Sequence, residues 1–455
     1  MCRGFYLLNF LPFEFYIYFL LTSFYICIMR NELKVLLANI SLISSIVTLA
    51  YFYLKNFLPK SKIRLEYVLF CLPLTWAVIS NILYINGWAR DSLWDINVVY
   101  CADLAYSLGA SPQTDWFVNA SCQESIPLQF TYLKLLLDIV PFSLFEYDFF
   151  EKVWVIFLGL AALGYGFISK KLFELEINYF FILIFILIAY QGSNIVSLQA
   201  GNIAVPIYLL VFFGILLLKH DKFQIIFFPI VAFATFLKFH LALFLLIPFM
   251  VQKFFNFKGY ILFFLTLSSL FGLNYLLHGP FINEWFANLK YVDMGLAPIF
   301  AEMDFLKSLW TTNGEAIMSK VQFNALCKIF IFPFFFLNLI FFRKYLINKV
   351  SDKEFFNILL ILSTFVFVLV LPRLKVYDFF IISCVSIKIY LDSIDTIVSK
   401  DFLLKIISIL IIILFYLSSI YWRPQWDLTN ISYYYVLSIY FLYQAMVIRK
   451  IKVKY

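Results

Sequence analysis

The sequence predicts an all-α integral membrane protein whose helices cross the bilayer many times. Of its 455 residues, 64% are hydrophobic and only 14% are charged, which is too few to cover the surface of a water-soluble protein. Apolar runs of about 18 to 22 residues, long enough for a helix to cross the hydrocarbon core, alternate with short charged connectors. No internal repeat, Gly/Ser-rich linker or hydrophilic domain interrupts them, so we expect one membrane domain over residues 1–455.

Residues 1–65 contribute spans that precede the main body of this domain. An apolar run fills residues 5–28 and lacks the small-residue cleavage site of a signal peptide. Met29, which is followed by basic residues, is an alternative start of the chain. Residues 66–400 are expected to form the functional core, and residues 401–455 to add C-terminal spans.

Basic residues fix the orientation of the expected spans. The connector 55–64 carries four of them, and the positive-inside rule places it in the cytoplasm. Residues 87–129, with five acidic residues and one Arg, then fall outside, within the first of two larger extracytoplasmic loops, 87–148 and 278–323. The later basic clusters all become cytoplasmic; they lie at 170–171, 219–222, 253–258, 343–349, 400–405 and 449–454.

Hydropathy and this alternation together predict about twelve to fourteen transmembrane helices. One segment, residues 223–251, has 29 residues, too few for two full spans and too many for one untilted span. We therefore expect a broken or re-entrant element, which places Lys238 and His240 near an internal site, because irregular backbone at membrane depth must line protein or a water-filled cavity. From residue 149 on, the spans are expected at 149–168, 178–196, 203–218, 223–237, 239–251, 260–277, 326–342, 355–371, 376–391, 402–420 and 433–448.

The outer stretch 87–129 contains the main catalytic candidate. Asp91, Asp95 and Asp103 lie within thirteen positions of one another beside a membrane boundary, where an ionisable residue is a functional candidate by default. The alternative is that all three are loop or helix-cap residues that face water. The motif W-D-I-N-V-V-Y, residues 94–100, favours a function for Asp95.

Two basic residues do not follow the positive-inside rule. Alternation places P-R-L-K-V-Y-D, residues 372–378, outside, so Arg373 and Lys375 need another explanation. Together with Lys238 they could hold a lipid phosphate; the alternatives are snorkelling to headgroups and a local salt bridge with Asp378. A carboxylate and a cationic pocket on one face suit attack of a hydroxyl on a sugar carried by a lipid phosphate. The carboxylate takes the hydroxyl proton, and the positive charge stabilises the departing phosphate.

Cysteine and histidine patterns give no indication of a metal or redox site. The seven cysteines include no C-x-x-C pair and the three histidines no H-E-x-x-H motif, so we expect no cofactor and no histidine-based metal site, and a requirement for a divalent ion stays open. Cys101 and Cys122 both lie in the outer stretch and could form a disulfide in an oxidising compartment. The net charge of +8 comes from clusters at span ends, so no nucleic-acid partner is expected.

Four segments follow, in order, the pattern of a known family. Residues 95–112, D-I-N-V-V-Y-C-A-D-L-A-Y-S-L-G-A-S-P, carry its Asp, paired-Tyr, Ala, Gly and Pro pattern. L-Q-A-G-N at 198–202 is similar to its Gly-Gln-x-Asn turn, L-K-F-H at 237–240 to its Lys-Pro break, and 372–378 to its late Pro-containing segment. Over about residues 66–400 the chain thus resembles the polyprenyl-phosphate-mannose-dependent α-(1,2)-mannosyltransferases of the GT-C superfamily. It departs from them at Cys101, which replaces an aromatic residue, at Asn202, where Gln is usual, and at Phe239, which replaces Pro.

The resemblance implies a GT-C-like membrane fold and a specific chemistry. We expect inverting transfer of a sugar from a polyprenyl-phosphate donor to a glycolipid or glycan acceptor, on the extracytoplasmic side of a bacterial inner membrane. Asp95 matches the family's general base, and Arg373, Lys375 and Lys238 are the candidates for binding the donor phosphate. The candidate substrate contacts are Asp91, Tyr100, Asn202, His240 and Tyr377.

Three other protein classes are consistent with parts of the pattern. An O-antigen polymerase or ligase resembles the chain in size and span number, but it is expected to use Arg in its long outer loops, and the sequence has no Arg between His278 and Lys328. A transporter of lipid-linked oligosaccharides or a flippase predicts charges at the bilayer midplane and two related halves, neither of which is visible in the sequence. In a purely structural membrane protein, the polar residues at span ends would serve packing alone.

Overall fold

The structure, a computed structural model, divides the chain into two compact units, Met1–Arg90 and Asp91–Tyr455. All described residues belong to the second unit, so the spans expected before residue 90 lie outside them. The described residues are 94–108, 134–139, 141–177, 179–190, 194, 197–198, 200–220, 222–252, 256–278, 311–312, 315–316, 320–371, 376–418 and 425–454.

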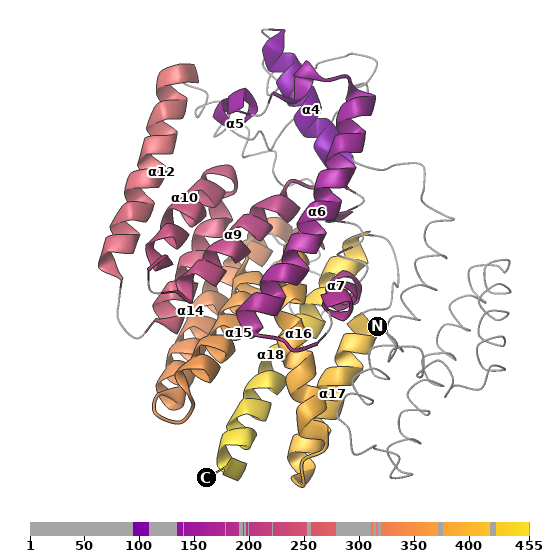
Figure 1. Ribbon diagram of the computed structural model, residues 1–455, viewed down its shortest axis with the longest axis vertical. Helices are drawn as coiled ribbons and strands as arrows, with labels where there is room; N and C mark the ends of the chain where they lie inside the picture. Colours follow the sequence, from indigo (N-terminus) through magenta and orange to yellow (C-terminus); the bar gives the residue numbers. More distant parts are fainter. Residues whose placement is uncertain are drawn as a thin grey trace, which may run out of the picture. The chain divides into compact units, whose positions relative to one another are not determined.

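The described part of the chain is helical apart from one short antiparallel ladder, β1 (Thr311–Thr312) with β2 (Glu315–Ala316) (Figure 1). Its α-helices are α4 (Trp94–Ser107), α5 (Lys134–Ile139), α6 (Tyr147–Phe173), α7 (Tyr179–Ile188), α9 (Ala204–Leu218), α10 (Phe227–Leu237), α11 (Leu246–Val251), α12 (Phe257–His278), α14 (Lys320–Leu346), α15 (Asp352–Val370), α16 (Phe380–Ile397), α17 (Phe402–Ser418) and α18 (Gln425–Lys454). Its 3₁₀ helices are η2 (Phe142–Leu144), η3 (Gln224–Ile226), η4 (Phe239–Leu245) and η7 (Val376–Phe379).

Helices α15 and α16 form the buried centre of the described part. Every residue from Asn357 to Leu371 is buried, and α16 packs against α6, α7, α9 and α17. The outer helices instead expose large apolar side chains, such as Phe264 and Leu276 of α12, which are 61% and 81% exposed. An apolar outer face of this kind requires lipid or another apolar partner. Four described helices are long and apolar enough to cross a membrane, Tyr147–Phe173, Phe257–His278, Ile329–Leu346 and Asp352–Val370, which agrees with an α-helical membrane protein.

Each span expected from residue 149 onward falls on a helix, but the span expected at 178–196 is broken. Helix α7 ends at Ile188, and Tyr190 adopts a left-handed conformation with φ 54°. The Asn194 Nδ2 group lies 2.7 Å from the carbonyl oxygen of Ile186 and 2.6 Å from that of Ala189. The helix stops there because this amide satisfies its last carbonyls. The hydropathy profile does not indicate this break in the span, because a single Asn hardly changes the mean hydropathy of an apolar window.

Helices α6 and α9 run parallel between two ends of the bundle. Near the start of α6, Trp154 Nε1 donates a hydrogen bond of 2.9 Å to the carbonyl of Gly201, just before α9. Just after α9, Lys219 Nζ lies 3.0 Å from the carbonyl oxygen of Leu172, in the last turn of α6. We call the first the Asp95 end, because the backbone N–H of Asp95 donates to the neighbouring carbonyl of residue 200, and the second the basic end.

Side chains from separate connectors bind one another at the basic end. Glu174, after α6, forms ion pairs with Lys219, after α9, and with Lys353, in the first turn of α15. Arg343, near the end of α14, donates from Nε to the carbonyl of Met250 in α11 over 3.0 Å, where a cation offsets the helix dipole. These connectors are ones that the positive-inside rule assigns to a single side, and the contacts show that they share one end.

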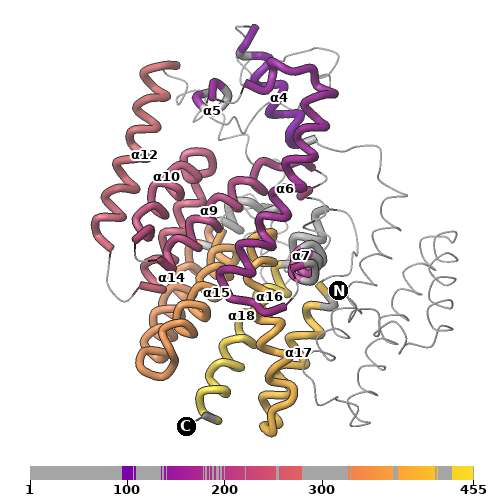
Figure 2. Tube along the Cα trace, in the orientation of Figure 1, coloured from indigo at the N-terminus to yellow at the C-terminus, as the bar shows by residue number. Residues whose placement is uncertain are grey.

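The C-terminal helices also meet at this end. Helices α17 and α18 lie side by side, and the C-terminus of α18 is close to the start of α17 (Figure 2). Arg449 of α18 binds Asp401, which precedes α17, with 2.6 Å between Nη2 and Oδ2 and 3.1 Å between Nε and Oδ1. The guanidinium group lowers the pKa of the Asp401 carboxyl through these hydrogen bonds. A bidentate pair of this kind fixes the ends of two helices relative to each other.

Residues 223–251 form a short helical hairpin, as expected for a broken element. Helices η3 and α10 lead away from the basic end, the backbone becomes extended at Lys238 (φ −145°, ψ 101°), and η4 and α11 return. The two ends meet where Gln252 Nε2 donates to Gln224 Oε1 over 2.7 Å. Each arm is roughly 22 Å long by the rises of α and 3₁₀ helices, shorter than the ~30 Å hydrocarbon core. Lys238 therefore lies at the tip, on the side away from the basic end.

Candidate functional site

Asp95 lies in the first turn of α4, where two contacts hold it against the turn before α9. Its backbone N–H donates to the carbonyl of Ala200 over 2.9 Å, and its Oδ2 accepts a hydrogen bond of 2.6 Å from Nδ2 of Asn202. From the sequence, Asp95 is the predicted general base and Asn202 a predicted substrate contact. The structure brings these two residues together although 107 positions separate them in the chain.

The turn that carries Asn202 is built from local chemistry. Gly201 has φ 67°, a left-handed conformation that glycine adopts without steric cost. Its carbonyl accepts the indole N–H of Trp154, which fixes the turn to α6. The Asn202 side chain caps α9, because its Oδ1 accepts the backbone N–H of Ala204 over 2.7 Å. Residues 200–202 thus form a turn just before α9 that is held by hydrogen bonds to α4, α6 and α9.

The carboxylate of Asp95 has one oxygen available for chemistry. Oδ2 is bound to Asn202, whereas Oδ1 accepts no hydrogen bond from any residue that the structure describes. The side chain is partly exposed, so a ligand can reach it. A half-buried carboxylate with one bound and one open oxygen can accept a proton from a hydroxyl group that binds beside it.

Tyr100 and Asp103 of α4 have packing roles. The Tyr100 hydroxyl donates to the carbonyl of Phe145 over 2.9 Å, and its ring contacts Tyr147 and Phe150 with centroids 5.1 and 5.4 Å away. Desolvation raises the pKa of Tyr100, with a contribution from nearby carboxylates, so the hydroxyl stays protonated. Asp103 is 6% exposed and accepts the backbone N–H of Ser143 over 2.6 Å. It caps η2, which agrees with the helix-cap alternative, although it is buried rather than facing water.

Several predicted site residues lie outside the described part of the chain or have only their backbone described. Asp91, Arg373, Lys375 and Cys122 lie outside the described residues, and Tyr377 belongs to η7 but only its backbone is described. Cys101 is in a disulfide, whereas Cys122, its predicted partner, lies outside the described part. The two reduced cysteines among the described residues are Cys327 and Cys384.

A second polar group lies inside the bundle, between α9, η4, α15 and η7. Asp378 is fully buried and accepts a hydrogen bond of 2.5 Å from the hydroxyl of Tyr208, which is also fully buried. The Tyr208 ring contacts Phe367, as does the imidazole of His240, with centroid separations of 6.2 and 6.4 Å. His240 of η4 therefore lies near this interior group through the contact with Phe367 that it shares with Tyr208.

From the sequence, Asp378 is a candidate only for a local salt bridge, and Tyr208 is not a candidate site residue. The available signal was an acidic residue at the start of an apolar span, where a charge is costly unless it is paired. The partner could not be read from the sequence, because Tyr208 is 170 positions away.

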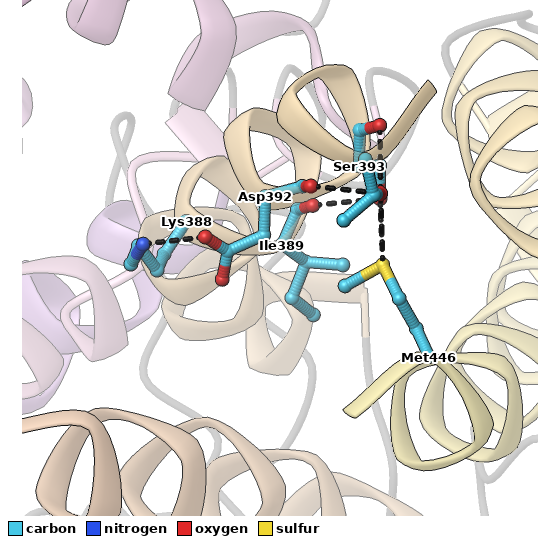
Figure 3. Close-up of polar contacts among 6 residues, drawn as sticks. Lys388, Ile389, Asp392, Ser393 and Met446 are labelled. Carbon is cyan, nitrogen blue, oxygen red and sulfur yellow. Dashed lines mark hydrogen bonds and ion pairs between the residues drawn. The ribbon is translucent and has the colours of Figure 1, made fainter. Parts of the chain in front are cut away.

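Helix α16 carries a further pair that sequence analysis did not single out. Lys388 Nζ and Asp392 Oδ1 are 2.6 Å apart, four residues apart on one helix face, and their side chains are 25% and 15% exposed. One position further, the Ser393 hydroxyl donates to the carbonyl of Ile389 over 2.8 Å and lies 3.7 Å from the sulfur of Met446 (Figure 3). The sequence feature that indicates this pair is two opposite charges at positions i and i+4 inside an apolar run.

The chemistry of these groups is that of carboxylates, amides and hydroxyls. Within the described part of the chain, no three His, Cys, Asp or Glu side chains are grouped so that they could hold a metal ion. The arrangement around Asp95 can instead support proton transfer to a fixed carboxylate oxygen. No protein-family model, curated protein or solved structure matches this chain.

Proposed function

We propose that the protein is a membrane glycosyltransferase that moves a sugar from a polyprenyl-phosphate donor to a lipid-linked or glycan acceptor, with inversion, on the extracytoplasmic face. The observation that carries the proposal is the geometry of Asp95. Asn202 holds one carboxylate oxygen at 2.6 Å, the other receives no hydrogen bond from the described residues, and the site lies at the end of the bundle away from the basic connectors.

The reaction is a single displacement at the anomeric carbon. The acceptor hydroxyl gives its proton to Asp95 while its oxygen forms a bond to that carbon, and the bond from the carbon to the phosphate oxygen breaks. The polyprenyl phosphate leaves with the electron pair, so the configuration at the anomeric carbon inverts. One positioned carboxylate supplies the base, typically worth about 10²- to 10⁴-fold in rate.

The departing phosphate requires positive charge. Arg373, Lys375 and Lys238 are the proposed source, and the position of Lys238 at the hairpin tip, away from the basic end, supports its part. A guanidinium group can contact two phosphate oxygens at once, which makes Arg373 the strongest of the three. The exposed apolar faces of α6, α12 and α14 provide lipid contact for a protein whose donor carries a polyprenyl tail.

A transporter of lipid-linked oligosaccharides is the second candidate. The Lys388–Asp392 pair favours it, because charges inside an apolar helix are typical of substrate and ion pathways. It would move the lipid-linked sugar without forming a new glycosidic bond.

An assay in vesicles that contain the purified protein distinguishes sugar transfer from transport. Wild type is given a radiolabelled polyprenyl-phosphate sugar and a glycolipid acceptor, with a nucleotide sugar in a parallel reaction. The proposal expects label in the glycolipid from the polyprenyl donor alone, with an inverted linkage, and at least about tenfold less label with Arg373→Ala. Movement of the labelled donor between leaflets with no labelled glycolipid would support transport and contradict the proposal.

A further inference from the structure

We propose that Asn202 is a positioning residue for Asp95 rather than a substrate contact. Its amide binds Oδ2 of Asp95 and leaves Oδ1 as the oxygen that takes the acceptor proton. This inference rests on the proposed function, because it assigns a task to Asn202 only if Asp95 is the base. It replaces the expectation that Asn202 touches the substrate.

The orientation of the Asn202 amide is fixed by its own contacts. The side chain is 5% exposed, and its Oδ1 accepts the backbone N–H of Ala204 over 2.7 Å. Since a backbone N–H can only donate, the oxygen of the amide must face α9 and the NH₂ group must face Asp95. The contact with the first turn of α9 therefore fixes the orientation of the amide, so the NH₂ group is the donor to the Asp95 carboxylate.

The turn beneath Asn202 is equally constrained. Its backbone N–H donates to the carbonyl of Ser197 over 3.3 Å, and the carbonyl of the preceding Gly201 accepts the Trp154 indole N–H over 2.9 Å. Trp154 is only 7% exposed. Side chains held by packed helices keep a reacting group within a narrow range of positions, which is what positioning requires.

Asp95 is held at two points by this one turn. Its N–H binds the carbonyl of Ala200, and its Oδ2 binds Asn202, so backbone and carboxylate are fixed together. The remaining oxygen, Oδ1, then points in one direction for the acceptor hydroxyl. When the acceptor O–H bond breaks, the proton forms a bond to Oδ1, and the hydrogen bond from Asn202 to Oδ2 is kept throughout.

Asn202→Asp separates positioning from helix capping. Aspartate caps helices about as well as asparagine, so the hydrogen bond from Ala204 is retained. The variant loses the NH₂ donor and places a second carboxylate against Asp95. We expect kcat for sugar transfer to fall about 10²-fold. The KM for the polyprenyl-phosphate sugar should stay within about twofold, because an interaction that positions the base does not bind the donor.

The exchanged pair Asp95→Asn with Asn202→Asp serves as the matched control. It rebuilds one amide-to-carboxylate hydrogen bond between α4 and α9 with the donor and acceptor reversed, so it should unfold within about 1 kcal/mol of wild type. The contact between α4 and α9 is then restored without a carboxylate at position 95. Positioning of Asp95 predicts that the exchanged pair is folded and at least about 10²-fold slower than wild type, because the base has moved.

The outcomes distinguish the two proposals. Loss of kcat in Asn202→Asp, with an inactive exchanged pair, supports both. If Asn202→Asp transfers sugar as fast as wild type while Asp95→Asn is inactive, the positioning role is wrong and the proposed function stands. If Asp95→Asn is as fast as wild type, the proposed function fails, and the role of Asn202 fails with it. Recovery of wild-type activity by the exchanged pair would show that Asp95 is not the base, and the inference would fail together with the proposed function.

Discussion

Two aspartates on one helix illustrate how surroundings decide the role of a residue. Asp103 of α4 is 6% exposed, and its carboxylate accepts a hydrogen bond from the backbone N–H of Ser143, so it stabilises the turn at η2. Asp95, two helical turns earlier, is partly exposed and is held by a side-chain amide at one oxygen only. Both are aspartates on one helix, and the difference in role follows from the partner that contacts each of them.

The buried Tyr208–Asp378 contact gives a prediction about stability. Tyr208→Phe removes a hydrogen bond to a carboxylate that has no exposed surface, so we expect the free energy of unfolding to fall by about 1.5 to 3 kcal/mol. Tyr165→Phe is the matched control, because Tyr165 is also fully buried and donates to α9, but to the neutral carbonyl of Val205 over 2.5 Å. It should cost about 1 kcal/mol. Denaturant unfolding in detergent micelles measures both, and equal losses would contradict a special role for the carboxylate.

The candidate site was predictable in part. Asp95 could be predicted from the sequence because acidic residues are rare beside apolar spans. Asn202 could be predicted because it is the last residue of a segment whose sequence is typical of a turn. That Asn202 binds Asp95, and that Tyr208 binds Asp378, depends on helix packing between residues more than 100 positions apart. A single sequence carries no local signal for such contacts.

At the scale of elements, the hairpin 223–251 shows how a chain too short for two spans is accommodated. η4 is a seven-residue 3₁₀ helix, longer than most, and its rise of about 2.0 Å per residue extends the returning arm. The break at Lys238 places Lys238 and His240, both partly buried, at the tip of the hairpin. Length alone predicted the break, and the hydrogen bond between Gln224 and Gln252 defines it as a hairpin.

The parallel packing of α10 against α12 depends on a glycine. A Cβ atom at Gly259 would lie 2.1 to 2.5 Å from the ring of Phe228, which is fully buried and packs against Tyr260 with centroids 5.1 Å apart. Gly259→Ala should therefore destabilise the protein by about 1 to 3 kcal/mol, because the ring must move within a packed interface. Thermal unfolding in detergent measures the effect.

Gly272 of the same helix is the control. A Cβ atom there meets nothing within 4 Å, so Gly272→Ala should be neutral or stabilise the helix by up to about 1 kcal/mol. If the two alanine variants unfold at the same temperature, the close approach of α10 and α12 at Gly259 is not present in the folded protein.

At the scale of the whole molecule, the described helices run between the Asp95 end and the basic end. Hydropathy and the positive-inside rule predicted the helices and the grouping of the basic connectors well, because both follow from the solvent and not from packing. Those methods could not predict the early stop of α7 at Ile188, since that depends on Asn194 reaching two carbonyls. The central position of α15 and α16 likewise follows from packing.

The basic end makes stability depend on pH in a defined direction. Hydrogen bonds from Lys219 and Lys353 lower the pKa of Glu174 to about 2, from an ordinary value of 4.5. A carboxylate whose pKa is lower in the folded state stabilises fully above its unfolded value, and this contribution is lost as the pH falls through the folded value. Glu174→Gln should therefore be less stable than wild type above about pH 5, and the difference should vanish toward pH 2.

This difference should be small, because the Glu174 side chain is half exposed and solvent screens the ion pairs. Melting temperatures between pH 2 and pH 7 measure it, with Glu176→Gln, an exposed carboxylate in the same connector, as control. A gap between wild type and Glu174→Gln that widens as the pH falls would contradict the ion pairs.

The proposed orientation can be tested by labelling. Leu144, 76% exposed, lies before α6 at the Asp95 end, and Val398, 53% exposed, lies between α16 and α17 at the basic end. In intact cells, a membrane-impermeant maleimide should add label to Leu144→Cys relative to the parent chain and none to Val398→Cys. Disrupted membranes should label both. Labelling of Val398→Cys alone in intact cells would reverse the orientation.

The most direct test of the central claim is the rate of sugar transfer by Asp95→Asn. This change keeps the size of the side chain and removes its ability to take a proton, so kcat should fall at least about 10²-fold while the protein remains folded. Asp148→Asn, the same change at an exposed residue of the same end, should transfer at the wild-type rate. If Asp95→Asn is as fast as Asp148→Asn, Asp95 is a helix-end residue that joins α4 to the turn before α9, and it is not the base.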